Sequence, residues 1–242
     1  MKLLSLPSLV SILSTLLVAV FSITACASGK DNKVENSDKK IENGDKEESL
    51  GIRPPAPGLT IHEVMTPSEL DNNLIDRIAA AGANVSTING SFAIVPSGKK
   101  KDVERTIREF PLPEDIIPAW SYSEIKDNRI NGGNGFFNLY FITKTPAIDN
   151  EEIEYLSIDH IEMANDGREE IINGHLTDEG AYAFANITKD NIGKPLAFVL
   201  DGKIISAPRI NSQIKGGNFQ IAGYFENVQK MFDMLTAPEI SK

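Results

Sequence analysis

The sequence predicts an α+β protein made of two small units, and this prediction rests on turn and helix-capping signals. Asn89-Gly90 and Asp201-Gly202 each lie between two short apolar runs, and such dipeptides supply the positive φ angles of a tight β-hairpin. Residues 66–69 and 177–179 join a threonine that can cap a helix to acidic residues in the first turn. Hairpins interleaved with capped helices are typical of the α+β class.

The first unit, residues 59–122, is expected to form a ferredoxin-like base with the order β-α-β-β-α-β. Leu70, Leu74 and Ile78 recur at helical spacing and predict one buried helix face. Pro118 lacks a backbone N–H, so we expect the last strand to lie at a sheet edge. The expected elements are a strand at 59–65, a helix at 66–81, strands at 84–88 and 91–95, a helix at 99–110 and a strand at 116–122.

The second unit, residues 136–237, is expected to be α+β with antiparallel hairpins. Thr177 is predicted to cap a helix that ends at Gly193. Residues 146–165 fit either a short helix or a strand. The other expected elements are strands at 136–143, 169–175, 196–200, 203–207 and 218–223, and a closing helix from 226.

The N-terminus is interpreted as a bacterial lipoprotein signal peptide, residues 1–25. A basic start at Lys2 is followed by a short apolar stretch and then by small residues directly before Cys26. This site resembles a lipobox, whose cysteine receives lipid and becomes the new N-terminus. Cys26 is the only cysteine of the chain, so it is the candidate lipidation residue and no disulfide framework is expected.

The remaining segments are expected to be connections. Residues 26–58 are polar and poor in large apolar side chains, so they cannot offset the entropy of ordering and predict a disordered tether. Residues 123–135 predict a polar loop, and residues 238–242 a short tail. The expected location is the cell envelope, outside the cytoplasm. In a host with two membranes, the resemblance to lipoproteins that lack Asp after the lipid-bearing cysteine implies the periplasmic face of the outer membrane. In a host with one membrane, the expected location is the outer face of the plasma membrane.

Composition excludes several functional classes. The net charge of −10 argues against nucleic-acid binding, which needs a basic surface. From residue 59 on, no apolar run is long enough to span a bilayer, so the membrane contact is expected through the lipid alone. His62, His160 and His175 have no metal-like spacing, and Asp201 is explained by its turn. We therefore expect no catalytic residue, no metal and no cofactor.

Residues 176–225 resemble the periplasmic P1 head of the SecD/SecDF family. The family pattern is a helix beginning Thr-x-Glu-Gly-Ala, then Gly-Lys-x-Leu-Ala, Leu-Asp-Gly, Ser-Ala-Pro, Gly-Gly and Gln-Ile-x-Gly. The matching residues are Thr177/Glu179/Gly180/Ala181, Gly193/Lys194/Leu196/Ala197, Leu200/Asp201/Gly202, Ser206/Ala207/Pro208, Gly216/Gly217 and Gln220/Ile221/Gly223. Residues 140–146 also resemble the strand that enters the head, and the first unit resembles the family's base in layout.

The resemblance implies a role in protein export. SecD carries six membrane spans, works with SecF and depends on intramembrane charged residues for proton-coupled motion; this chain is expected to lack that motor. It is expected to be a non-enzymatic, lipid-anchored protein that binds exported, unfolded polypeptides or components of the Sec translocase. The alternative is a structural or regulatory module that docks to one folded envelope partner.

Four aromatic residues near the predicted junction of the two units are the candidate polypeptide-binding residues: Trp120, Tyr122, Phe136 and Phe137. An aromatic cleft there would suit apolar segments of an unfolded chain, and open sheet edges could add an extended strand. The same residues could instead form the core between the two units.

Overall fold

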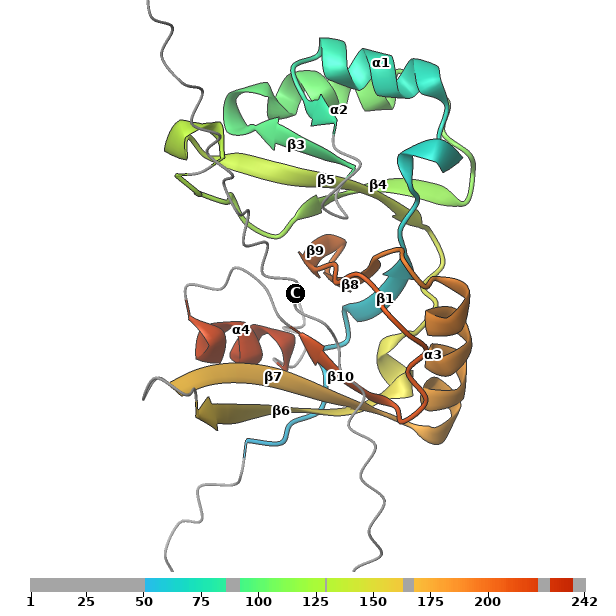
Figure 1. Cartoon of the computed structure of the whole chain (residues 1–242), viewed down its shortest axis with the longest axis vertical. Helices are drawn as coiled ribbons and strands as arrows, with labels where there is room; N and C mark the ends of the chain where they lie inside the picture. The colour runs from blue at the N-terminus through green and yellow to red at the C-terminus, as the bar shows by residue number, and fades with distance from the viewer. Residues whose placement is uncertain (1–50, 86–91, 129, 163–167, 222–226, 237–242) are drawn as a thin grey trace, which may run out of the picture.

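A computed structural model describes residues 51–85, 92–128, 130–162, 168–221 and 227–236. The described part is layered (Figure 1): α1 and α2 lie on one outer side, a large curved sheet follows, and a smaller sheet with α4 lies on the other side. The expected Asn89-Gly90 hairpin and Cys26 fall outside the described residues.

Two sheets and four α-helices make up the described residues. The large sheet has the order β1 (Leu59–Glu63), β8 (Leu196–Leu200), β9 (Lys203–Ser206), β4 (Ile116–Ser121), β5 (Phe136–Thr143), β3 (Ala93–Pro96) and β2 (Asn84–Val85). The small sheet has the order β10 (Asn218–Ile221), β7 (Arg168–Leu176) and β6 (Ile153–Glu162). The helices are α1 (Asn72–Ala80), α2 (Lys100–Arg108), α3 (Asp178–Asp190) and α4 (Val228–Leu235), with short 3-10 turns η1 (Pro67–Glu69), η2 (Ser97–Lys99), η3 (Asn131–Gly133) and η4 (Asn150–Glu152).

The α+β class and the local signals are confirmed. The Thr177 hydroxyl accepts a hydrogen bond from the Gly180 N–H at 3.1 Å and so caps α3. Asp201 and Gly202 have φ values of 49° and 76°, as a tight β-hairpin requires. One boundary was wrong: the helix expected from Thr66 stops after η1, because Leu70 is extended, and Asp71 caps a new helix by accepting from the Asn73 N–H at 2.7 Å.

The two predicted units exchange strands in the large sheet. The order β-α-β-β-α-β along residues 59–121 is as expected, but β1 pairs with β8, whereas a ferredoxin-like sheet would place it beside β3 and β4. The position between β3 and β4 is taken by β5, from the second unit. The edge position expected for the last strand was wrong, because β4 lies between β9 and β5. Pro118 is tolerated there because β9 pairs with β4 only at Trp120 and Ser121, beyond the proline.

Five strands of the large sheet curve into a nearly closed ring. β1, β8, β9, β4 and β5 are neighbours in this order, and bridges from Val64 to Ile142 and from Ile61 to Ile148 connect the two ends. One buried cluster draws on four of these strands and on Val64, just after β1. Its members are Val64, Ala119, Tyr140, Ile142, Ala197, Val199 and Ile204. The ring therefore has a packed interior.

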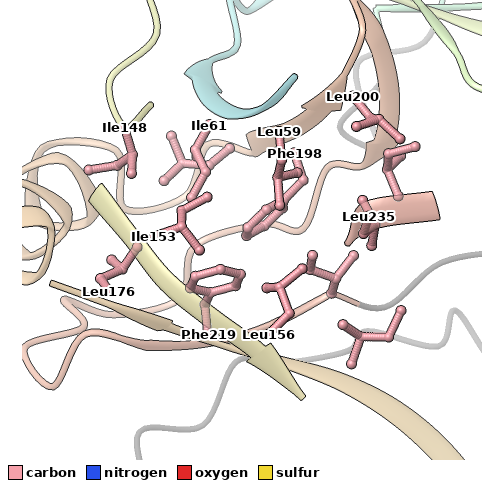
Figure 2. Packing of buried hydrophobic residues seen from close by; sticks show 14 of the residues in the cluster. Leu59, Ile61, Ile148, Ile153, Leu156, Leu176, Phe198, Leu200, Phe219 and Leu235 are labelled. Carbon is pink, nitrogen blue, oxygen red and sulfur yellow. The ribbon is translucent and has the colours of Figure 1, made fainter. Parts of the chain in front are cut away.

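Two further cores lie outside the ring. Leu74, Ile78, Val103 and Ile107 of α1 and α2 pack against β3 and β5. On the other side, β1 and β8 face the small sheet, and Leu59, Ile61 and Phe198 meet Leu156 and Phe219 between them (Figure 2). The same outer face of the large sheet is thus covered by helices over one half and by the small sheet over the other.

Residues 51–58, the end of the predicted tether, are bound to the folded part of the chain. The Arg53 N–H donates to the Leu156 carbonyl at 2.9 Å, and the Leu156 N–H donates back at 2.8 Å. The Arg53 guanidinium pairs with Asp233 of α4 at 2.7 Å, and Ala56 is only 5% exposed. The chain therefore enters the fold along the edge of β6.

His62 lies in the seam where β1 approaches β5. Its side chain is buried, Nδ1 is 2.7 Å from the Thr143 carbonyl, and Nε2 is 2.9 Å from the Thr60 hydroxyl. Because a carbonyl only accepts, Nδ1 carries the proton and the neutral ring accepts at Nε2. Burial lowers the pKa of His62, and the hydrogen bond to Thr143 opposes this shift only in part.

This environment predicts acid sensitivity of the fold. A histidine whose pKa is lowered by folding is protonated more readily in the unfolded chain, so its contribution to stability is complete above about pH 6.5 and declines as the pH falls below that value. Urea unfolding at pH 7.5 and pH 5.5 should show a lower free energy of unfolding at pH 5.5. His62→Gln should flatten this dependence. An unchanged dependence in the variant would assign the acid sensitivity to other groups.

Polar contacts also connect the two predicted units directly. Lys194, after α3, pairs with Glu69 of η1 at 2.5 Å, and the Asn191 amide donates to Glu63 at 2.9 Å. Partial burial raises the pKa of Glu69, but hydrogen bonds from Lys194 and Thr66 outweigh this effect and bring the pKa to about 2. The Glu69 carboxylate therefore stays ionised at all but strongly acidic pH.

Candidate functional site

Three of the four candidate aromatic residues lie together on the outer face of the large sheet. Trp120 is on β4, Phe137 is on β5, and Tyr122 follows β4 directly. All three rings are half-buried. They lie where the sheet passes from the helix layer to the small sheet.

Two lysines complete this site. The Lys100 ammonium, at the start of α2, lies 3.9 Å from the centre of the Phe137 ring and 5.1 Å from that of Trp120. The Lys203 ammonium, on β9, lies 5.4 Å from the centre of the Tyr122 ring. We call Lys100, Trp120, Tyr122, Phe137 and Lys203 the junction strip.

Strand pairing explains why the strand residues of the strip share one face, and Lys100 reaches that face from α2. Trp120 is opposite Leu139 on β5, so Phe137, two residues before Leu139, points the same way. On the other side Trp120 is opposite Lys203 in the parallel pair of β4 and β9. The strip therefore crosses three neighbouring strands, with rings and cations interleaved.

Tyr122 also connects the strip to the second unit. Its hydroxyl lies 3.8 Å from the Met234 sulfur on α4, and its N–H donates to the Ile204 carbonyl at 2.8 Å. Tyr122 also packs against the core between the large and the small sheet. The strip thus contains residues of both units.

Phe136 does not belong to the strip. It is only 2% exposed, and its backbone pairs with Ile125 through two hydrogen bonds of 2.9 Å and 2.8 Å. Successive side chains of a strand point to opposite faces, so Phe136 and Phe137 cannot both face the same surface. Phe136 is buried on the opposite face of β5, so of these two residues only Phe137 faces the strip.

The two lysines were missed by sequence reasoning. Lys100 and Lys203 are far apart in the chain, and no spacing relates either to Trp120. Only the pairing of β4 with β9 and the packing of α2 on β5 bring them to the rings. Their alternation with the rings is a property of the tertiary structure.

A second surface feature is less suited to polypeptide. A hollow of about 480 Å³ lies between α1 and α2, lined by Arg77, Lys99 and Arg105 together with Asp102 and Glu109. Its charges are mixed, and Arg105 already pairs with Asp102 at 3.0 Å. In the residues that the structure describes, no group of three or more His, Cys, Asp or Glu side chains could hold a metal ion.

No helix in the described residues is both long and apolar enough to cross a bilayer.

Comparison with known proteins identifies sequences similar to the second unit. Residues 126–234 match the family model of the SecDF P1 head subdomain. The protein translocase subunit SecD of Acetobacter pasteurianus is 35% identical over 166 residues, which cover 61% of this chain and 32% of that protein. SecD of Acidaminococcus fermentans is 38% identical over 128 residues, covering 50% of this chain and 31% of that protein. The matches thus span about a third or less of these relatives.

Solved structures of SecDF also align with the chain. A structure of a membrane component SecDF that enhances protein export aligns with a TM-score of 0.33 and 18% identity, covering 74% of this chain and 91% of that one. SecDF from Thermus thermophilus, a translocon-associated membrane protein, aligns with a TM-score of 0.27 and 19% identity, covering 77% and 28%. The assignment rests on the sequence matches: this chain carries, at residues 126–234, a region similar to the SecDF P1 head subdomain.

Proposed function

We propose that this protein is a lipid-anchored, non-enzymatic component of the cell envelope that acts in protein export by holding unfolded polypeptide at the junction strip. The observation that carries the proposal is the coincidence of two features. A region similar to the SecDF P1 head is joined to the first unit at a surface of half-buried aromatic rings.

The chemistry of the strip fits an unfolded client. Half-buried rings offer large contact areas at a low cost in side-chain entropy, and aromatic anchors dominate many protein interfaces. An unfolded client exposes apolar side chains that a folded protein buries. The rings of the strip therefore distinguish the two states by the apolar surface that the client exposes.

A binding assay with one client in two states tests the proposal. The full-length chain, kept in detergent, is titrated into a labelled secretory protein that is either native or reduced and alkylated with a neutral reagent. We expect saturable binding of the reduced form and much weaker binding of the native form. Equal, negligible binding of both would reject the proposal. Capture of a single stoichiometric envelope protein without client binding would favour a docking module instead.

The lipid anchor gives a separate prediction. Cys26→Ser removes the thiol that would be acylated. In detergent phase separation, the wild-type protein from a bacterial host should enter the detergent-rich phase and the variant the aqueous phase. Mass spectrometry should show an acylated N-terminal peptide in the wild type alone. A variant that still enters the detergent phase would show that the anchor is not a lipid on Cys26.

A further inference from the structure

Within the described part of the chain, the two lysines of the junction strip have no carboxylate partner. Arg53, Lys194 and Arg105 each pair with an acidic side chain at 2.5 to 3.0 Å. Among the described residues, Lys100 and Lys203 have no carboxylate within ion-pair distance, and their ammonium groups lie over aromatic rings. Other described lysines also lack a carboxylate partner, but these two are distinguished by the aromatic rings beneath their ammonium groups.

We propose that the strip prefers client segments in which acidic side chains flank a large apolar residue. This inference rests on the proposed function and adds the chemistry of the ligand. An aromatic ring contacts one side of a lysine ammonium group. The N–H donors on the other side can still donate to a carboxylate of a client. A client that places carboxylates beside the lysines and an apolar side chain between them satisfies both components of the strip.

The spacing of the strip suits an extended segment. Neighbouring strands lie about 4.8 Å apart, so the strip extends roughly 10 Å from β5 to β9. In an extended peptide, residues i, i+2 and i+4 share one face and span about 13 Å. An acidic residue at i, an aromatic residue at i+2 and an acidic residue at i+4 therefore match the alternation of cations and rings. The same backbone with lysines at i and i+4 would meet repulsion at both ends.

The size of the preference follows from the exposure of the two lysines. Lys203 is exposed and Lys100 is half-buried, so each ion pair should contribute weakly, about two- to fivefold in affinity. We expect the acidic peptide to bind about 4- to 25-fold more tightly than the neutral glutamine peptide at low salt, and the lysine peptide to bind more weakly than the neutral one. Because the contribution is a screened surface charge effect, the differences should shrink at about 0.5 M salt.

The experiment uses the fluorescence of Trp120, the only tryptophan of the chain, which lies within the strip. The full-length protein is titrated with three tryptophan-free peptides that differ only at positions i and i+4, which are Asp, Gln or Lys. Lys100→Gln and Lys203→Gln should each reduce the preference, and the double variant should remove it. Lys215→Gln, an exposed lysine outside the strip, should leave the preference unchanged.

The outcomes separate this inference from the proposed function. Equal binding of all three peptides would overturn the acidic preference and leave polypeptide binding intact. Failure of all three to bind, together with failure of the reduced client, would reject both. A Trp120 signal that depends on protein concentration alone would assign the strip to contact between two copies, which also overturns the inference.

Discussion

Phe219→Ala is expected to lower the free energy of unfolding by about 3–5 kcal/mol. Phe219 is only 1% exposed, and its ring lies 5.2 Å from Phe198 and 6.1 Å from Phe184 between the two sheets. Removal of the ring would leave a cavity lined by strands of both sheets and by α3. These elements are fixed by their own packing and cannot move in to fill it. Chemical unfolding followed by circular dichroism measures the effect.

A double-mutant cycle sharpens this prediction. Gly174 lies opposite Phe219 on β7, and a Cβ added there would collide with the Phe219 ring. Gly174→Ala alone should therefore destabilise the fold by about 1–3 kcal/mol through overpacking. In the Phe219→Ala background the same change should cost much less, because the ring is gone. Strictly additive effects would contradict the packing of the ring over the glycine.

Trp120→Ala is expected to weaken binding of a reduced client by about 30-fold, the effect typical of a central aromatic anchor. Trp120 lies at the centre of the strip, between Phe137 on one side and Lys203 on the other. Because the substitution removes the intrinsic fluorophore, the affinity is measured from the anisotropy of a labelled client. The variant should remain folded by circular dichroism, since the ring is only half-buried.

A matched aromatic control separates a local effect from a general loss of apolar surface. Tyr182 on α3 is 75% exposed and lies outside the strip. Tyr182→Ala should leave client affinity unchanged. An equal loss in both variants would indicate nonspecific adhesion, and an unchanged affinity in Trp120→Ala would place the binding surface elsewhere.

Local signals in the sequence predicted local structure well. The capping threonine of α3, the positive φ angles at Asp201-Gly202 and the apolar face of α2 all follow from short-range physics. Strand partners could not be predicted in the same way. The composition of residues 59–63 and 136–143 indicates strands, but it carries no information on which neighbours they choose. The exchange of β1 and β5 between the units is therefore visible only in the tertiary structure.

For the candidate site, too, the sequence predicted what depends on local residues and not what depends on strand partners. Trp120, Tyr122 and Phe137 could be grouped because they lie close to the junction in sequence. Strand alternation alone is enough to separate Phe136 from Phe137, because successive side chains of a strand point to opposite faces. Lys203 could not have been found from the sequence, because it is the parallel pair of β4 and β9 that places it beside Trp120.

Crosslinking from position 120 tests the central claim most directly. A photoreactive amino acid replaces Trp120 in the full-length protein, with the same replacement at Tyr182 as the control site. A reduced, unfolded client is then added. Polypeptide binding at the junction strip predicts strong crosslinks from position 120 that an excess of unlabelled unfolded client removes, and weak crosslinks from position 182. Equal crosslinking from both positions, or none from position 120 under conditions in which the client binds, would contradict it.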